Sequence, residues 1–401
     1  MARSVAAHRQ AVEDLLSNLR GPSRTTMLPL LDALGLALAV DVVAPISLPP
    51  FDNSQMDGFA VRSKELSHGG GVLRVVAPVP AGAAPQPLEP GTAAPIMTGA
   101  MIPKGSDAVV PVERAVPAAF PPPQSRSSVM LPKTDAGDYV RRTGSDIAEG
   151  TVALEAGTAL GPGQLGLLAA LGLTEVEVYR PLRVLLLTTG DEVVPPGNPL
   201  GPGKIYDSNG TLLEAAMRQA GLEVRRLDIS GDEPDVFLEL VRGRMDSADL
   251  VVTTGGVSKG AYEVVRQAMD GQAIEFLSVA MQPGGPQGIG TFDGLPFLGF
   301  PGNPVSCLVS FEMFLRPALG ALFGAPAPRP VVRARLAEAL TSPAGKHQVR
   351  RATLRTDGIV QLEGGAGSHL MHALARSNAF VQVPEGVTDL PAGAEVEVWM
   401  L

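Results

Sequence analysis

A continuous apolar run followed by small polar residues occupies residues 182–192, LRVLLLTTGDE. The run from Val184 to Leu187 does not alternate between apolar and polar residues, which predicts a strand buried on both faces. The polar residues after it then form the loop that leaves the carboxyl end of the strand. In an open α/β sheet, ligands bind in the crevice outside this end of the strands. We therefore expect a binding loop at residues 188–192.

The same strand-and-loop pattern recurs twice further along the chain. Residues 249–258 read DLVVTTGGVS, and residues 295–306 read LPFLGFPGNPVS. Strand and helix patterns alternate over residues 182–324, which predicts a mostly parallel sheet. The carboxyl ends of parallel strands lie at one edge of a sheet, so the three loops are expected to border a single crevice.

Segments rich in short strands flank this α/β region on both sides. Residues 49–144 contain many prolines and glycines between short apolar runs, a pattern that predicts a small β domain or barrel. Residues 325–401 begin with the proline-rich stretch APAPRP and predict a second, C-terminal β-barrel-like domain. The expected fold class is therefore α/β plus β, in several domains, with the α/β domain at residues 181–324.

The remaining segments, residues 1–48 and 145–180, are expected to form one helical and extended linking domain. Apolar residues recur at helical spacing in residues 4–20 and 27–39, so a helix is predicted in each.

Composition limits the class of protein. The chain has 401 residues, of which 45% are hydrophobic, so it is long enough for two or more domains. Its 32 basic and 41 acidic residues give a net charge of −9, which argues against general binding of nucleic acid. Cys307 is the single cysteine, so no intrachain disulfide can form. With no apolar signal core and no run of roughly 18 apolar residues, the protein is expected to be cytoplasmic.

The loops at residues 188–190 (TTG) and 253–256 (TTGG) offer backbone N–H groups, hydroxyls and little bulk. Such a loop ahead of a helix can hold an anion. One loop of this kind is more often an ordinary turn between strand and helix. Two such loops, together with the sequence PGNP at 301–304, reverse that preference and favour an anion site.

Carboxylates lie next to these loops. Asp191 and Glu192 could hold a hard cation or transfer protons, or they could be an acidic pair at a helix N-terminus. Asp207 could belong to the site or could be the N-cap of the next helix. Asp232 adds a carboxylate at another junction between strand and helix. A group of carboxylates beside anion-binding loops would suit Mg²⁺ that bridges a phosphorylated substrate.

Short strings of distinctive composition follow one another along the chain. They are NSQMDGFA (53–60), IMTGAMIP (96–103), VRRTGSDI (140–147), TTGDE (188–192), KIYDSN (204–209), TTGGVS (253–258) and FPGNPVS (300–306). In order and spacing they resemble the molybdopterin molybdenumtransferase family, of the MoeA and gephyrin E-domain type. The resemblance covers residues 1–325, and the C-terminal β module fits it too.

The resemblance implies an elongated subunit of four domains that forms a homodimer through the linking domain, with a central sheet domain of molybdopterin-binding type. It implies a reaction in which molybdate is inserted into adenylated molybdopterin with Mg²⁺, and AMP and molybdenum cofactor are released. It also implies contact with other proteins of cofactor biosynthesis or with molybdenum enzymes. The alternatives are a molybdopterin-binding paralogue without catalysis, which would carry the cofactor, and a scaffold that binds peptides.

The resemblance assigns roles to individual residues of this sequence. The expected catalytic residues are Asp57, Thr98, Glu192 and Asp207, of which Glu192 and Asp207 are also the expected metal ligands. In the family's dimer, Asp57 and Thr98 approach the crevice of the other subunit. The expected substrate-binding residues are Thr188, Thr189, Gly190, Asp191, Asp232, Gly255, Gly256, Ser258, Lys259, Pro301, Gly302, Asn303, Pro304, Ser306, Arg351 and Ser368.

The sequence also departs from the family pattern. Ala261 stands where the family has an aspartate, and Ser145 stands where it has a glutamate. The family string KPGKP, whose two lysines attract anionic substrates, reads QPGGP here, with Gln282 and Gly285 in place of the lysines. Loss of two cations weakens the attraction for anions. Candidates to restore a positive charge are Lys259, Arg350 and Arg351.

Overall fold

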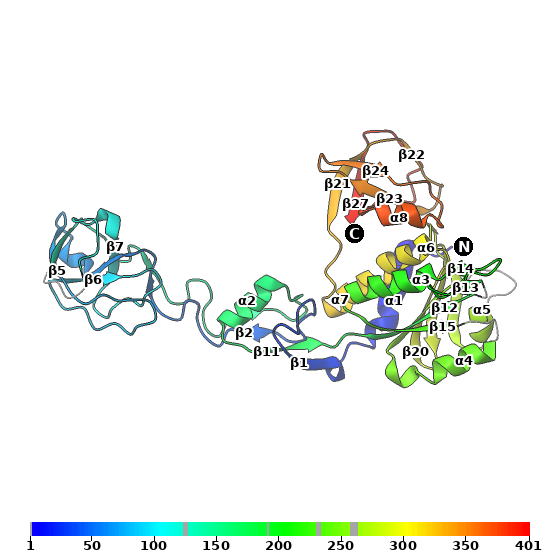
Figure 1. Ribbon diagram of the computed structural model, residues 1–401, viewed down its shortest axis with the longest axis horizontal. Coiled ribbons are helices and arrows are strands. Elements are labelled where there is room, and N and C mark those ends of the chain that lie inside the picture. The colour runs from blue at the N-terminus through cyan, green and yellow to red at the C-terminus, as the bar shows by residue number, and fades with distance from the viewer. Residues whose placement is uncertain (1, 123–126, 191, 230–233, 257–263) are drawn as a thin grey trace. The chain divides into compact units, whose positions relative to one another are not determined.

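The computed structural model describes residues 2–122, 127–190, 192–229, 234–256 and 264–401. It consists of two compact units, and each is described by itself. The first comprises Met1–Val40, Ala156–Gly161 and Glu175–Leu401, and the second comprises Asp41–Glu155 and Pro162–Thr174 (Figure 1). The finer division into four domains stays a prediction.

The centre of the first unit is a six-stranded sheet in the order β15-β12-β16-β20-β19-β17. Its strands are β15 (Glu223–Ile229), β12 (Arg183–Thr189), β16 (Leu250–Thr254), β20 (Leu295–Phe300), β19 (Pro286–Phe292) and β17 (Ala273–Ser278). The first four run parallel to their neighbours, whereas β19 and β17 pair in the antiparallel direction. The sheet is therefore mixed, with a parallel half that carries the three repeated strand-and-loop units.

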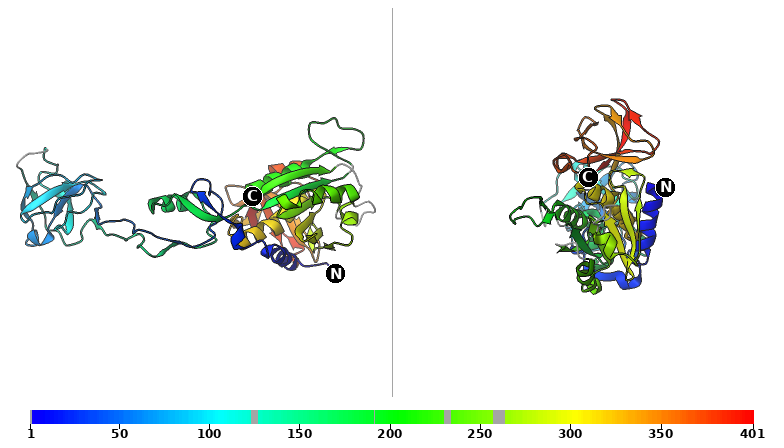
Figure 2. Two further views of the ribbon diagram at one scale, coloured as in Figure 1. Left: turned by 90° about the horizontal axis from the view of Figure 1, so that it is seen from below. Right: turned by 90° about the vertical axis from the view of Figure 1, so that its right-hand side faces the viewer.

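Helices cover both faces of this sheet (Figures 1 and 2). Val184 and Leu186 of β12 belong to one buried cluster, while Leu185 and Leu187 belong to another on the opposite face. This double burial is the reason that the strand is apolar throughout. The helices of the first face are α1 (Val5–Ser17), α3 (Ser208–Gln219), α6 (Pro304–Ser310) and α7 (Arg316–Phe323), and those of the second are α4 (Pro234–Arg242) and α5 (Val264–Ala268).

Residues 304–323 form one long apolar helix, in which a π-helical turn at Phe311–Leu315 joins α6 to α7. By length and composition this helix could cross a membrane, and within the described residues it alone meets that test. However, 72% of its most apolar 18-residue window is buried inside the fold. The side chains of Phe311 and Phe314 are fully buried in the cluster under the sheet, as expected for a core helix.

Residues 331–400 form a closed five-stranded barrel, in which β23 pairs with both β24 and β25. Its strands are β21 (Val331–Leu336), β23 (His347–Leu354), β24 (Ile359–Leu362), β25 (Ala379–Val383) and β27 (Glu395–Met400), with β22 (Leu340–Thr341) and β26 (Asp389–Leu390) as a side ribbon and α8 (Met371–Arg376) between β24 and β25. A short strand from outside the barrel, β18 (Met281–Gln282), extends it by pairing in parallel with β23. The barrel is thus joined to the segment that leads from β17 into β19.

The second unit contains a five-stranded sheet in the order β7-β4-β6-β5-β8. Its strands are β4 (Gly58–Val61), β5 (Gly71–Val75), β6 (Thr92–Ile96), β7 (Ala108–Pro111) and β8 (Ser128–Leu131), and its other elements are β2 (Val42–Val43), β3 (Asn53–Ser54), β9 (Val140–Arg141), β10 (Val152–Leu154) and α2 (Pro162–Ala170). Its core is built on Phe59, which is fully buried.

The expected helix at residues 27–39 is wrong. Residues 25–29 form strand β1 (Thr25–Pro29), which pairs in the antiparallel direction with β11 (Glu175–Tyr179), and turns follow. Pro29 has no N–H for a helical hydrogen bond, and Gly35 adopts a φ of 82° that favours glycine. Leu31 is 82% exposed, so the apolar pattern here does not mark a face buried in this subunit.

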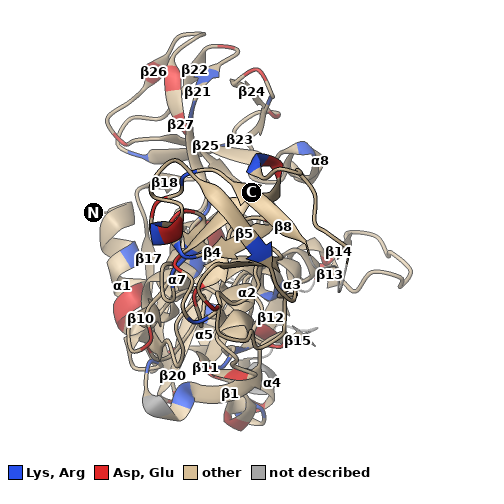
Figure 3. Cartoon of the chain, turned by 90° about the vertical axis from the view of Figure 1, so that its left-hand side faces the viewer, with Lys and Arg blue, Asp and Glu red and all other residues tan. Residues whose placement is uncertain are grey.

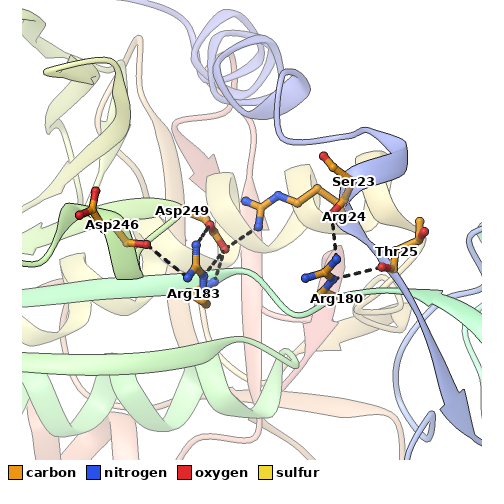
Figure 4. Close-up of polar contacts among 7 residues, drawn as sticks. All are labelled: Ser23, Arg24, Thr25, Arg180, Arg183, Asp246 and Asp249. Atoms are coloured by element: carbon orange, nitrogen blue, oxygen red, sulfur yellow. Dashed lines mark hydrogen bonds and ion pairs between the residues drawn. The ribbon is translucent and has the colours of Figure 1, made fainter.

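An ionic cluster holds the N-terminal segment against the base of the sheet (Figure 4). Asp249, one residue before β16, is 4% exposed. It accepts hydrogen bonds from the backbone N–H, Nε and Nη2 of Arg183 at 2.9, 3.2 and 2.7 Å, and Nη1 of Arg24 lies 2.8 Å from it. Arg180 donates to the carbonyls of Ser23 and Thr25 beside it.

Basic and acidic residues are interspersed along the described ribbon (Figure 3). The full chain carries a net charge of −9.

Candidate active site

Three loops lie together at the carboxyl ends of β12, β16 and β20. In the register of the sheet, Thr188 is opposite Thr254, and Thr254 is opposite Phe300. The three parallel strands therefore end at the same level of the sheet. This arrangement brings the segments after them to one place, although they are far apart in sequence.

The loops border a cavity of about 1300 Å³. Its lining includes many of the residues expected from the sequence, namely Thr188, Thr189, Gly190, Glu192, Asp207, Gly255, Gly256, Pro301, Gly302, Asn303, Pro304, Ser306 and Ser368. A cavity of this size can hold a ligand larger than a mononucleotide.

Two buried hydroxyls belong to residues that border the cavity. The side chains of Thr188 and Thr189 are 5% and 6% exposed. Neither Oγ1 atom has a hydrogen-bond partner among the described residues. An unpartnered buried hydroxyl costs free energy unless a ligand or water bonds to it. Both residues border the cavity, and their hydroxyls have unused hydrogen-bonding capacity.

The glycine loops allow the chain to approach itself closely. Gly255 has a φ of 92°, and a Cβ atom there would lie 2.9 Å from the carbonyl oxygen of Thr189. A Cβ atom on Gly302 would lie 3.4 Å from the Cα atom of Gly255. The three loops therefore pack backbone against backbone, and the N–H of Gly255 donates to the carbonyl of Phe300 at 3.1 Å.

Asn209 connects two of these loops to helix α3. Its Nδ2 donates to Oγ1 of Thr254 at 3.1 Å and to the carbonyl of Gly302 at 2.5 Å. One side chain near the N-terminus of α3 thus fixes the loops after β16 and β20 relative to each other. Asn209 is not among the residues expected from the sequence to bind substrate, although it lies two residues after Asp207 in the string KIYDSN.

Asp207 is buried, and both of its carboxylate oxygens have internal partners. Oδ1 accepts a hydrogen bond from the backbone N–H of Gly210 at 2.9 Å, as an N-cap of α3 does. Oδ2 lies 2.6 Å from Nη2 of Arg226 in a buried ion pair. The capping role, one of the two alternatives from the sequence, is therefore present, and the catalytic and metal-binding roles stay predictions.

Glu192 is exposed at the cavity, and its carboxylate lies close to Gly190. Among the described residues, no three His, Cys, Asp or Glu side chains form a metal-binding group. Mg²⁺ is commonly held by one or two carboxylates together with substrate phosphates and water. The residues present fit that mode, with Glu192 free to act as a ligand and Asp207 tied to Arg226.

Asp57 and Thr98 lie in the second unit and contact each other. The backbone N–H and Oγ1 of Thr98 donate to Oδ1 of Asp57 at 2.7 and 2.8 Å. These hydrogen bonds, that of the backbone first, lower the pKa of Asp57 below its usual value. Asp57 is therefore an exposed carboxylate that stays ionised at neutral pH.

The C-terminal barrel contributes to the same cavity. Ser368 lines it, and the carbonyl of Ser368 accepts the backbone N–H of Val305 at 3.0 Å. Arg351, by contrast, does not line the cavity. Its side chain is 3% exposed, and its guanidinium donates to the carbonyl of Gly365. A substrate contact by Arg351 stays a prediction.

Some predicted residues lie outside the described part of the chain. These are Asp191, Asp232, Ser258 and Lys259, together with Ala261 at the position of the family aspartate. Gln282 and Gly285, which replace the family lysines, both line the cavity. Lys346 lines it too. No local motif marks Lys346, because its place depends on the pairing of β18 with β23.

Cys307 is fully buried, and burial raises the pKa of its thiol to about 12. Its Sγ atom lies 3.5 Å from Oγ1 of Thr254. The thiol is therefore uncharged at neutral pH and packs as a small core residue.

Known families match almost the whole chain. The model of the MoeA N-terminal region (domain I and II) matches residues 3–172, that of a probable molybdopterin binding domain matches residues 185–321, and that of the MoeA C-terminal region (domain IV) matches residues 333–401.

Full-length relatives and solved structures agree with these matches. Molybdopterin molybdenumtransferase 2 of Mycobacterium tuberculosis (strain CDC 1551 / Oshkosh) is 43% identical over 100% of both chains. Molybdopterin molybdenumtransferase of Haemophilus influenzae is 35% identical over 97% of each chain. The crystal structure of the molybdopterin biosynthesis MoeA protein from Pyrococcus horikoshii OT3 superposes with a TM-score of 0.84, at 26% identity over 100% of both chains. Another MoeA structure from this archaeon gives a TM-score of 0.81 at 30% identity, over 100% of this chain and 99% of the other. The chain therefore belongs to the MoeA family of molybdopterin molybdenumtransferases.

Proposed function

We propose that this protein inserts molybdate into adenylated molybdopterin and releases AMP, which is the last step of molybdenum cofactor biosynthesis. The observation that carries the proposal is the cavity at the ends of β12, β16 and β20. It is bordered by glycine loops and by threonines whose buried hydroxyls have no partner among the described residues, and both kinds of group can bind oxyanions. The names of the full-length relatives support the same reaction.

Different residues of the cavity bind different parts of the substrate. Thr188 and Thr189 donate hydroxyl hydrogen bonds to the oxygens of the phosphate or the molybdate. The glycine backbones of the loops after β16 and β20 hold the pterin and its phosphate at short range. Asn209 keeps those two loops in register through Thr254 and Gly302.

Mg²⁺ belongs to the proposal as a cofactor that Glu192 and substrate oxygens would hold. When bound, the ion offsets the negative charge of phosphate and molybdate. The part played by the chain is to present a free carboxylate at Glu192 and to keep Asp207 fixed against Arg226.

The proposed active unit is a cytoplasmic homodimer, in which Asp57 and Thr98 of one subunit complete the cavity of the other. Hydrogen bonds from Thr98 hold Asp57 in its ionised form. Asp57 could then orient or deprotonate a group of the substrate at the cavity mouth.

The first test is the release of AMP from adenylated molybdopterin in the presence of molybdate and Mg²⁺. We expect release by the wild-type protein and its loss in Asp57→Ala. Asp135→Ala is a matched control, because Asp135 is a 79% exposed aspartate of the same unit. Tight binding of molybdopterin without any AMP release would refute the transferase and favour the carrier function.

A mixing experiment tests whether the site is shared between subunits. Asp57→Ala and Glu192→Ala place their defects in different units of the chain. If each cavity is completed by the partner, mixed dimers contain one intact site, and random exchange of subunits restores about a quarter of the wild-type activity. No recovery after verified exchange would contradict the shared site.

A further inference from the structure

Lys346 is a positively charged residue in the lining of the cavity. Among the described residues that line the cavity, it is the only lysine or arginine. The acidic lining residues are Glu192 and Asp207, of which Asp207 is neutralised by Arg226. A site for phosphate and molybdate needs positive charge, and Lys346 is the described side chain that can supply it directly.

Strand pairing brings Lys346 to the cavity. The backbone N–H of His347 donates to the carbonyl of Ala280 at 2.9 Å. In the register that follows, Met281 is opposite His347 and Gln282 is opposite Gln348. Lys346 therefore precedes the barrel strand that lies directly beside the QPGGP segment.

Gln282 stands at the position of a family lysine, and its side chain is engaged with the barrel. Nε2 of Gln348 donates to Oε1 of Gln282 at 2.7 Å. The amide of Gln282 is neutral and is held toward the neighbouring strand. The positive charge missing from β18 is thus present next to it, at the start of β23.

The ammonium group of Lys346 is available to a ligand. The residue is exposed, and its side chain makes no hydrogen bond or ion pair with any residue that the structure describes. A lysine with a flexible stem and no fixed partner can reach an anion at short range.

We propose that Lys346 binds the anionic group of the substrate, a phosphate or molybdate, and takes over the charge that Gln282 and Gly285 do not carry. This inference rests on the proposed function, because that function makes the ligand an oxyanion.

The test measures the dissociation constants of AMP and of molybdate by titration calorimetry for the full chain. We expect Lys346→Gln to weaken the binding of AMP by about tenfold and to reduce its dependence on salt. Lys346→Arg keeps the charge and is expected to bind like the wild type. Lys64→Gln, which removes an exposed lysine of the second unit, is the matched control.

The variant Lys259→Gln tests the competing explanation that Lys259 supplies the positive charge, as the sequence suggested. The proposal is overturned if Lys346→Gln binds AMP and molybdate as tightly as the wild type, or if Lys259→Gln alone carries the loss. Wild-type protein that binds AMP through Lys346 but releases none from adenylated molybdopterin would refute the proposed function and support the inference. Failure of the wild type to bind either anion would overturn both.

Discussion

The ionic cluster around Asp249 makes stability depend on pH in a defined window. Burial of Asp249 raises its pKa, but the hydrogen bonds and charges of Arg183 and Arg24 outweigh this effect and lower the pKa from 3.8 to about 2. Above the unfolded value the carboxylate is ionised in both states, and its contribution is fully present. As the pH falls from about 4 toward 2, the unfolded chain takes up the proton first, so the contribution is lost.

The size of the effect follows from the pKa shift. A change from 3.8 to about 2 corresponds to about 2.4 kcal/mol of stabilisation. The side chain of Arg183 is 44% exposed, so solvent screens part of the interaction. We therefore expect a net contribution of about 1 to 2 kcal/mol at neutral pH.

Urea unfolding of Asp249→Asn tests this reasoning. The variant should lose about 1 to 2 kcal/mol relative to the wild type at pH 6, and the difference should shrink as the pH falls to 3. The backbone N–H of Arg183 donates a hydrogen bond to Asp249. Hydrogen exchange at this N–H should therefore be faster in Asp249→Asn than in the wild type at pH 6. Asp357→Asn, which breaks an exposed pair with Arg355, is the control and should change stability little. A difference between wild type and Asp249→Asn that does not change with pH would refute the argument.

Three further predictions concern His8, Asn209 and Gly255. Burial, and then the charge of Arg3, lowers the pKa of His8 from 6.5 to about 4. The free energy of unfolding should therefore fall by up to about 3 kcal/mol as the pH falls from 6.5 to 4. The variant His8→Leu should remove this pH-dependent loss in thermal melts. Asn209→Ala should destabilise the fold by about 1 to 2 kcal/mol, with faster hydrogen exchange in the loops after β16 and β20. Gly255→Ala should cost about 1 to 3 kcal/mol of stability and weaken AMP binding in calorimetry, whereas Gly201→Ala, with room for a Cβ atom, should do neither.

The sheet was predictable where burial leaves a pattern in the sequence. The unbroken apolar run from Val184 to Leu187 marks a strand covered on both faces, and the structure places alternate residues in two clusters. The direction of β17 and β19 was not predictable in this way, because a buried strand has the same composition in either direction. The segment at 27–39 was misread because its leucines have helical spacing, although pairing with β11 and Pro29 decide its conformation.

The candidate site, like the sheet, could be predicted from the sequence only in part. The glycine and threonine loops follow their strands directly, so their meeting at one edge of the sheet could be expected from the order of elements. The position of Lys346 at the cavity could not be expected in this way, because it depends on the pairing of β18 with β23. No local sequence pattern predicts that pairing. The two roles open to Asp207 could be named from the sequence, but the partner Arg226 comes from a neighbouring strand.

The sheet domain forms the loops of the cavity, whereas the C-terminal barrel supplies Lys346, the positive charge beside them. The parallel pairing of β18 with β23 joins these two parts of the chain. A homologous barrel grafted onto this sheet domain would bring its own residue to the position of Lys346, and the site would change its affinity for anions while every loop kept its sequence. If Lys346 binds the anion as we propose, variation in the barrel would tune the affinity of the site for oxyanions without any change in the loops of the sheet domain.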